Sequence, residues 1–413
     1  MQAESPAFQT GLSLAEAQAR IVQIAANYTL PSEPVALESA LGRILAEDVN
    51  APFDVPGFAN SAMDGYALRA ADLEPDAETK LRLVGTILAG GSDVPHVNRG
   101  TCVRITTGAP LPQGADTVVM KENTRAEGDV IAIAPGTQPG ANLRPAGEDY
   151  RAGDRALASG AVLGPAQIGV LASFGLTHVA VARKPRVVLL TTGDELVPPG
   201  RPLAYGRVHD SNRYSLGALL EQHGADLIRH ERLRDDPPAL RDALVRAGGE
   251  ADLVVTSGGV SAGEADYLPT LLAEVGDVHL WKVRIKPGMP FLFGRAGRAL
   301  VFSLPGNPVS GIATFLAFVR PALDALTRRA GRGPGVYARL TQPVHKTHSR
   351  TEFLRAALVC DASGTLHATP LAKQGSGQLR GVAEADALIV LPEAAQEYAA
   401  GTIVEALPLP GWT

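Results

Sequence analysis

Three short apolar runs in the middle third of the 413-residue chain each end in a turn rich in glycine and polar residues. Short β-branched runs that alternate with helical patterns are typical of parallel strands, and open parallel sheets bind ligands beyond the carboxyl ends of their strands. We therefore expect the three turns to line one crevice. The runs and their turns are Val187–Leu190 with Thr191–Glu195, Leu253–Val255 with Thr256–Glu264, and Ala299–Ser303 with Leu304–Ser310.

The residue types in these turns are suited to an anionic ligand. Backbone N–H groups at helix starts bind tetrahedral oxyanions, and carboxylates between them suit a divalent cation. Asp194 and Glu195 could begin a helix, but the Pro-Pro-Gly sequence that follows at 198–200 favours a loop at the strand end. The small residues of Thr256–Glu264 can form an anion nest, while Asp266 after them is equally typical of a helix N-cap. The first expectation is a phosphate-bearing substrate.

Cations and a shaped loop add to this pattern. Lys282, Arg284 and Lys286 alternate, which predicts three cations on one face of a strand, although a solvated edge strand would look the same. The rigid turn Pro287–Pro290 would fix the direction of Lys286, and lysine is a common point charge for phosphate. Asn60–Tyr66 mixes apolar and polar residues without a period, which indicates a shaped loop rather than a strand.

Other polar groups have simpler interpretations. Asp210–Asn212 and Asp235–Pro238 are typical of a helix cap and a solvated turn, and Gly147–Asp149 is typical of a surface turn. The nine histidines show neither the i,i+4 spacing of zinc ligands nor a nucleophile partner signature. Covalent triad chemistry is therefore not expected.

Composition excludes several classes of partner. The chain has 38 Lys and Arg against 43 Asp and Glu, a net charge of −5, and no block of basic residues, so nucleic-acid and membrane partners gain no support. Cys102 and Cys360 both lie in apolar runs, which predicts buried thiols and a reducing compartment. The first residues do not resemble a signal peptide, and no apolar run approaches ~20 residues. We expect a soluble, cytoplasmic protein.

The length predicts several domains. Leu12–Asn27 is predicted to be an amphipathic helix capped by Ser13 and Glu16. Short strands then indicate a β-rich domain inserted between two parts of a flanking unit, followed by a doubly wound α/β domain and, after the linker Gly331–Gly335, a second β-domain. The expected bounds are 1–50 with 143–183 for the flanking unit, 51–142 for the inserted domain, 184–330 for the α/β domain and 331–413 for the closing domain.

These motifs, taken in order along essentially the whole chain, resemble the molybdopterin molybdenumtransferase family, the MoeA and gephyrin E-domain group of molybdenum-cofactor biosynthesis. So many ordered matches make chance similarity improbable. The matching stretches are Ser61–Ala67, Arg104–Pro110, Gly147–Asp149, Thr192–Leu196, Asp210–Arg213, Arg234–Pro237, Ser257–Tyr267, Lys282–Pro290 and Leu304–Ser310.

The resemblance implies an α/β multidomain fold with an elongated discontinuous domain, an inserted β-domain, a molybdopterin-binding α/β domain and a C-terminal β-barrel. It also implies a homodimer whose active site lies between the α/β domain of one subunit and the inserted domain of the other. The implied activity is insertion of molybdate into the dithiolene of adenylylated molybdopterin, with loss of AMP that depends on Mg²⁺ or another divalent cation.

The resemblance also implies a set of site residues. Within it, our hypothesis is that Glu195 and Asp266 hold the metal, that Lys282 and Lys286 neutralise phosphate or molybdate, and that Asp64 reaches across the dimer. The full implied catalytic set is Asp64, Thr107, Asp149, Glu195, Asp235, Asp266, Lys282 and Lys286. The implied pterin-phosphate and cofactor-binding residues are Ser257, Gly258, Gly259, Val260, Ser261, Pro305, Gly306, Asn307 and Pro308. Candidates for the molybdate site, by position only, are Arg350, Arg355 and Ser376.

Two alternatives stay open at this point. A molybdopterin adenylyltransferase would share the α/β domain and its Gly-rich turn but would not explain the inserted domain or the closing domain. A non-catalytic carrier or scaffold would keep the fold, although the carboxylates at Asp64, Glu195 and Asp266 favour retained chemistry. The expected partners are a molybdopterin adenylyltransferase upstream and apo-molybdoenzymes downstream.

Overall fold

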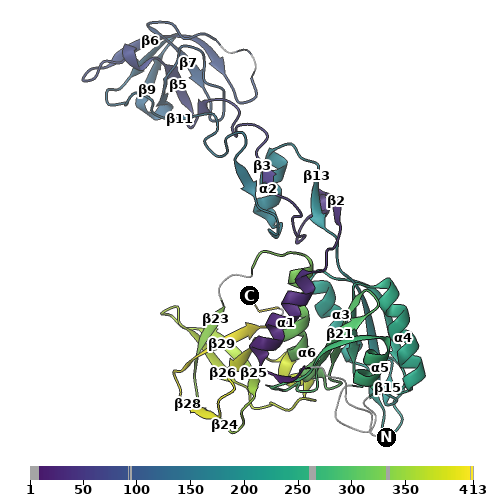
Figure 1. Cartoon of the computed structure of the whole chain (residues 1–413). Coiled ribbons are helices and arrows are strands. Elements are labelled where there is room, and N and C mark those ends of the chain that lie inside the picture. Colours follow the sequence, from purple (N-terminus) through teal and green to yellow (C-terminus); the bar gives the residue numbers. More distant parts are fainter. Residues whose placement is uncertain are drawn as a thin grey trace.

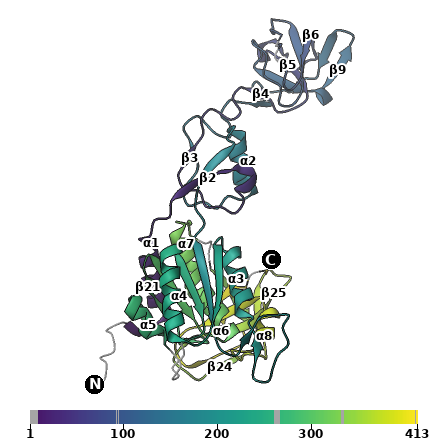
Figure 2. The ribbon, with the colours of Figure 1, turned by 90° about the vertical axis from the view of Figure 1, so that its right-hand side faces the viewer.

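The computed structural model describes residues 9–91, 93, 95–259, 267–331, 335–409 and 411–412. The molecule is elongated, with a small β-domain at one end, a slender linking unit in the middle, and a larger body at the other end (Figures 1 and 2). The larger body contains an α/β domain and, beside it, the β-barrel formed by the last part of the chain (Figure 1).

The α/β domain is built on a seven-stranded sheet with the order β1-β19-β21-β22-β18-β14-β17. Strands β22, β18, β14 and β17 are parallel, as predicted, but β21 is antiparallel to both of its neighbours, so the sheet is mixed. The strands are β1 (Gln9–Leu12), β14 (Arg186–Thr192), β17 (Asp226–Leu233), β18 (Leu253–Ser257), β19 (Gly276–Val283), β21 (Leu292–Ala296) and β22 (Ala299–Leu304).

Helices cover both faces of this sheet, which confirms the doubly wound arrangement. Along β14, Val187 and Leu189 belong to one hydrophobic core and Val188 and Leu190 to the other, because successive strand residues point to opposite faces. Helices α3, α6 and α7 pack on the first face, and α4 and α5 on the second. Their bounds are α3 (Asn212–Gln222), α4 (Pro237–Glu250), α5 (Leu268–Val275), α6 (Pro308–Thr314) and α7 (Arg320–Leu326), with a π-helical turn at Phe315–Val319 between the last two.

The predicted N-terminal helix is α1 (Leu14–Ala26), and it begins with the expected capping box. The Glu16 N–H donates to the Ser13 hydroxyl at 3.2 Å, and the Ser13 N–H donates to the Glu16 carboxylate at 2.8 Å. Its buried face does not join the linking unit, where residues 1–50 were expected. It packs into the α/β core beside α7, and β1 pairs with β19. An amphipathic pattern predicts that a face is buried but not which core receives it.

The linking unit is formed from two separate parts of the chain, as the discontinuous prediction requires. Strand β2 (Ser32–Ala36) pairs with β13 (His178–Ala182), and β3 (Val49–Asn50) pairs with β12 (Arg155–Leu157). Helix α2 (Pro165–Ser173) completes a small core that includes Leu45, Leu171 and Val181. The unit therefore holds the β-domain away from the larger body (Figure 2).

The inserted β-domain contains a six-stranded sheet with the order β8-β5-β7-β6-β10-β9. Cys102 is fully buried in it, and burial raises the pKa of its thiol to about 12, whereas Cys360 is exposed on the barrel and is not the core residue that was expected. The strands are β5 (Gly65–Leu68), β6 (Thr79–Ile87), β7 (Thr101–Ile105), β8 (Thr117–Met120), β9 (Thr124–Glu127) and β10 (Val130–Ile133), with a separate pair of β4 (Asn60–Ser61) and β11 (Leu143–Arg144).

The C-terminal domain is a closed five-stranded barrel, because β25 pairs with both β26 and β27. A short strand of the α/β domain, β20 (Ile285–Lys286), lies alongside β25 and extends the barrel sheet. The barrel strands are β23 (Val336–Leu340), β25 (Thr351–Cys360), β26 (Leu366–Pro370), β27 (Ala387–Leu391) and β29 (Ile403–Pro408).

One helical segment among the described residues, Pro308–Leu326, is apolar and long enough to cross a membrane. It is a core helix, since 78% of its most apolar window is buried inside the protein. Phe315 and Phe318 on this segment are fully buried in the α/β core.

Candidate functional site

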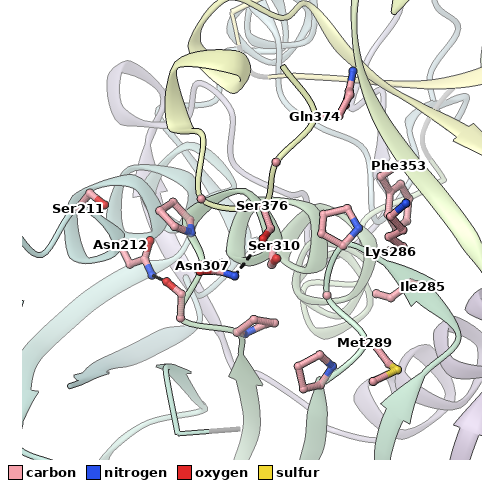
Figure 3. Close-up of a pocket in the computed structure, with 18 of the residues that line it drawn as sticks. Ser211, Asn212, Ile285, Lys286, Met289, Asn307, Ser310, Phe353, Gln374 and Ser376 are labelled. Atoms are coloured by element: carbon pink, nitrogen blue, oxygen red, sulfur yellow. Dashed lines mark hydrogen bonds between the residues drawn. The ribbon is translucent and has the colours of Figure 1, made fainter. Parts of the chain in front are cut away.

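A cavity of about 910 Å³ lies where the carboxyl ends of the α/β strands face the barrel. Figure 3 shows this cavity with the α/β elements below and the barrel loop that carries Gln374 and Ser376 above. The α/β domain contributes Glu195 and residues 210–212, 285–290 and 305–308, and the barrel contributes Arg350 and residues 352–354 and 374–377. The sequence pattern predicted a crevice lined by the α/β turns, and the barrel forms a second wall of this cavity.

The amide of Asn212 connects two of the three predicted turns. Its Nδ2 donates to the Ser257 hydroxyl at 2.8 Å and to the Gly306 carbonyl at 2.6 Å. The Gly258 N–H also donates to the Leu304 carbonyl at 3.1 Å. The turns after β18 and β22 thus lie together at one edge of the sheet, and Asn212 lines the cavity in Figure 3.

Glycine is required at 258 for two reasons. Its φ of +100° lies in a region that residues with a side chain rarely adopt. A Cβ at this position would also lie 2.6 Å from the carbonyl oxygen of Thr192. The first and second turns therefore contact each other through a position without a side chain.

The predicted cofactor-binding residues divide into those that the structure describes and those outside it. Ser257 is buried, and Pro305, Gly306, Asn307 and Pro308 line the cavity. Gly259 follows Gly258 with a φ of +70°. Val260, Ser261 and Asp266 lie outside the described residues.

Asn307 and Ser376 join the α/β domain to the barrel across the cavity. The Asn307 Nδ2 donates to the Ser376 hydroxyl at 2.9 Å (Figure 3), and the Val309 N–H donates to the Ser376 carbonyl at 3.1 Å. Ser376 and Arg350 both line the cavity. Arg355 does not: its side chain is 1% exposed, its Nε donates to the Lys373 carbonyl at 2.9 Å, and burial lowers its pKa.

The three cations do not share one face, contrary to the predicted alternation. Lys282 has a φ of +60°, which breaks the extended geometry, and its ammonium lies 4.1 Å from the centre of the Trp281 ring. Arg284 is turned away and forms an ion pair with Glu393 at 3.0 Å. Lys286 does line the cavity, and its Nζ lies 2.9 Å from Oε1 of Glu352.

The carboxylates near the strand ends have different surroundings. Asp210 is buried and accepts hydrogen bonds from the Thr191 hydroxyl at 2.7 Å and the Arg213 N–H at 3.0 Å. Asp235 accepts a hydrogen bond from the Asp194 N–H at 3.3 Å, so it lies beside the first turn. Glu195 is exposed and lines the cavity.

The carboxylates at the cavity can be compared with the ligands that the expected divalent cation requires. Among the described residues, no group of three or more His, Cys, Asp and Glu is arranged to hold a metal ion. Mg²⁺ in phosphate-binding enzymes commonly takes only one or two carboxylates and completes its shell with water and substrate phosphates. Glu195 offers one hard oxygen ligand of this kind, so the site fits a metal that binds together with an anionic substrate.

Asp64, Thr107 and Asp149 belong to the other end of the molecule. The Thr107 N–H and hydroxyl donate to Oδ1 of Asp64 at 2.9 and 3.0 Å. These bonds, with the nearby Lys121 ammonium at 3.6 Å, hold the pKa of the Asp64 carboxyl below its usual range. Asp149 lies where the β-domain joins the linking unit, and its N–H donates to the Val55 carbonyl at 2.9 Å. Within one chain the β-domain, with β5 and β11, lies at the opposite end of the molecule from the α/β domain and the barrel that form the cavity (Figure 1).

Sequence reasoning missed several residues of the cavity wall. Ser211 is the N-cap residue of α3, and the Asp210 carboxylate before it accepts a hydrogen bond from the Arg213 N–H in the first turn of the helix. The same motif also places Asn212 between two turns. Glu352 and Gln374 were not singled out at all. One signal was available for Glu352, because a charged residue at the start of the otherwise mostly apolar run Thr351–Cys360 is unusual in a buried strand.

Comparisons with known proteins cover almost the whole chain. Residues 12–175 match the MoeA N-terminal region (domain I and II), residues 188–325 a probable molybdopterin binding domain, and residues 337–409 the MoeA C-terminal region (domain IV). The flanking matches account for the inserted domain and the barrel, which an adenylyltransferase would leave unexplained.

Relatives of known name and a solved structure agree with these matches. The chain is 36% identical to the molybdopterin molybdenumtransferase of Haemophilus influenzae, covering 96% of this chain and 98% of that one. It is 35% identical to the enzyme of the same name from Bacillus subtilis, over 91% and 89% of the two chains. The fold matches the molybdopterin biosynthesis MoeA protein of Pyrococcus horikoshii OT3 with a TM-score of 0.85 and 29% identity, over 97% of this chain and 100% of that one. With its cavity, its domain order and these relatives in agreement, the chain belongs to the molybdopterin molybdenumtransferase family, whose members are enzymes of molybdenum-cofactor biosynthesis.

Proposed function

We propose that this enzyme inserts molybdate into the dithiolene of adenylylated molybdopterin and releases AMP with the help of a divalent cation. The observation that carries the proposal is the cavity of about 910 Å³ between the α/β domain and the barrel. Its wall combines a lysine, an arginine, an exposed carboxylate and turns with small residues. Both substrates are anions, and this combination can bind a phosphorylated ligand and a tetrahedral oxyanion together.

The charged groups of the cavity wall, and the turn after β18 beside it, each have a part in this proposal. The turns at Ser257–Gly259 and Pro305–Pro308 would hold the pterin phosphate through backbone N–H groups. Lys286 of the α/β domain and Arg350 of the barrel would neutralise phosphate or molybdate charge. Glu195 and Asp266 would hold Mg²⁺, which when bound supplies positive charge next to the phosphate bridge between adenylate and pterin.

The position of Asp64 and Thr107 supports a site shared between subunits. Their hydrogen-bonded pair lies on the inserted β-domain, away from the cavity of the same chain. A homodimer in which the β-domain of one subunit reaches the cavity of the other would bring the two groups of predicted residues together. The closed site would also exclude water from the reacting centre.

The proposed chemistry also defines the expected partners and compartment. A molybdopterin adenylyltransferase must supply the adenylylated substrate, and apo-molybdoenzymes must accept the finished cofactor. We place these transfers in the cytoplasm, in agreement with the few cysteines and their positions in apolar runs.

The proposal is tested by AMP release from purified protein given adenylylated molybdopterin, with and without molybdate and Mg²⁺, followed by reconstitution of a cofactor-free molybdoenzyme. We expect AMP release that requires both additions and yields active molybdoenzyme. Glu195→Ala should raise the Mg²⁺ concentration needed for half-maximal AMP release by at least about 10-fold. Loss of a residue that only supports a metal ligand already has an effect of this size, and Glu195 would be a ligand itself. Glu221→Ala, which removes an exposed carboxylate on α3, is the matched control. Tight adenylate binding without turnover would contradict the proposed reaction.

A further inference from the structure

We propose that Glu352 is a positioning residue that determines where the Lys286 ammonium lies in the cavity. The inference rests on the proposed function in one respect, namely that Lys286 faces an anionic substrate. Oε1 of Glu352 lies 2.9 Å from the Lys286 Nζ. The Glu352 side chain is 10% exposed, whereas that of Lys286 is 47% exposed. The carboxylate is therefore the fixed member of the pair and the ammonium is the member that reaches the cavity.

The backbone places these two residues side by side although they belong to different domains. Strand β20 of the α/β domain pairs in parallel with β25 of the barrel, and Lys286 is the register partner of Glu352. The Thr351 N–H donates to the Arg284 carbonyl at 2.9 Å and continues this pairing by one residue. Lys286 is thus held between the α/β sheet and the barrel, and the barrel supplies the counter-charge.

The other carboxylate oxygen of Glu352 faces a histidine, and a buried lysine anchors the segment before β25. Oε2 of Glu352 lies 3.3 Å from Nε2 of His348, which makes no hydrogen bond at that distance. Lys346, 2% exposed, anchors the same segment, because its ammonium donates to the backbone carbonyls of Glu393 at 2.9 Å and Ala394 at 3.1 Å. A functional side chain whose neighbours are themselves fixed by hydrogen bonds keeps its geometry better than a side chain on a mobile loop.

This arrangement has a consequence for turnover. Lysine has a flexible four-carbon stem, so an ammonium without a fixed partner samples many positions. A misplacement of about 1 Å at a reacting site can cost roughly 10²-fold in rate. We therefore expect Glu352→Gln, which keeps the size of the side chain but removes its charge, to lower kcat/KM for molybdate-dependent AMP release by roughly 10- to 100-fold.

A double-mutant cycle separates positioning from general damage to the barrel. AMP release is measured for the unmodified enzyme, Glu352→Gln, Lys286→Ala and the double variant, with thermal melting of each. If Glu352 acts through Lys286, adding Glu352→Gln to Lys286→Ala should change kcat/KM by less than about twofold. Glu352→Asp, which keeps the charge, should recover part of the activity that Glu352→Gln loses.

The matched control is Glu397→Gln, which removes the carboxylate of an exposed barrel ion pair with His345. Its activity should equal that of the unmodified enzyme. The inference is overturned if Glu352→Gln behaves like this control, or if it reduces kcat/KM by the same factor with and without Lys286. Either result leaves the proposed function intact. Full activity in Lys286→Ala would instead show that the reaction does not need Lys286. The positioning role of Glu352 would then be overturned as well.

Discussion

At the scale of single residues, the cavity depends on one buried amide. Asn212 is 9% exposed and donates both of its N–H groups to the two turns that were predicted to bind phosphate. A hydrogen-bonded side chain that joins two loops also limits how far they can move apart. Asn212 is therefore expected to act on both the stability and the ligand affinity of the site.

Asn212→Ala should destabilise the α/β domain by about 1–3 kcal/mol, because the Ser257 hydroxyl and the Gly306 carbonyl would lose a partner inside the protein. It should also weaken adenylate binding, because the turns would no longer be held together. Thermal melting and calorimetric titration with adenylylated molybdopterin measure the two effects. Ser215→Ala, on the same helix, removes a bond that stays within the helix and is the control. Unchanged affinity in Asn212→Ala would show that the turns are positioned without this bridge.

Residue patterns predicted some members of the site and not others. Glu195 lines the cavity as expected, because the turn after a parallel strand lies at the carboxyl edge of the sheet. Lys286 also lines it, beside the turn Pro287–Pro290 that was predicted to fix its direction. Lys282 does not, because the alternation argument assumes an extended backbone and its φ is +60°. Glu352 and Gln374 come from a different domain, so no local pattern near the Gly-rich turns could indicate them.

At the scale of elements, α1 shows how far a local pattern reaches. Its capping box and apolar stripe were both predictable, and both are present. Its packing partner was not predictable. The surface that buries α1 is completed by the π-helical turn Phe315–Val319, which lies nearly three hundred positions later in the chain. The helix therefore belongs to the α/β domain, although it precedes the linking unit in sequence.

Ile21→Ala should destabilise the α/β domain by about 2–5 kcal/mol, because Ile21 is fully buried in its core. The neighbouring Val22 is 37% exposed, so Val22→Ala should change stability by only about 0.5 kcal/mol. Thermal melting compares the two variants and is followed by tryptophan fluorescence, to which Trp281 on β19 of the same domain contributes. Equal melting temperatures would show that α1 contributes little to the folding of this domain.

At the scale of the whole molecule, the order of the domains was predictable and their contacts were not. Changes in pattern along the chain indicated the inserted domain and the closing domain, and the linker at 331–335 marked a boundary. Closure of the barrel depends on the pairing of β25 with β27, which joins distant parts of the chain. The separation of the Asp64 pair from the cavity is likewise visible only in the folded molecule (Figure 1).

That separation leads to a prediction about mixed dimers. Asp64→Ala and Glu195→Ala should each abolish most turnover alone, because each would damage both sites of the proposed symmetric dimer. After subunit exchange, a mixed dimer would contain one site with an intact β-domain and an intact cavity. Because half of the dimers in an equal mixture are mixed and each has one intact site of two, activity should return to about one quarter of the unmodified level.

The control for this experiment pairs two changes in the same domain. Asp64→Ala mixed with Thr107→Ala should restore nothing, because every site would then receive a damaged β-domain. Native mass spectrometry verifies that exchange has occurred, and molybdate-dependent AMP release reports the activity. Recovery in the first mixture but not in the second requires that Asp64 serve the cavity of its partner. If exchange is complete and neither mixture recovers, each chain must bring its own β-domain to its own cavity, and the linking unit would then have to bend.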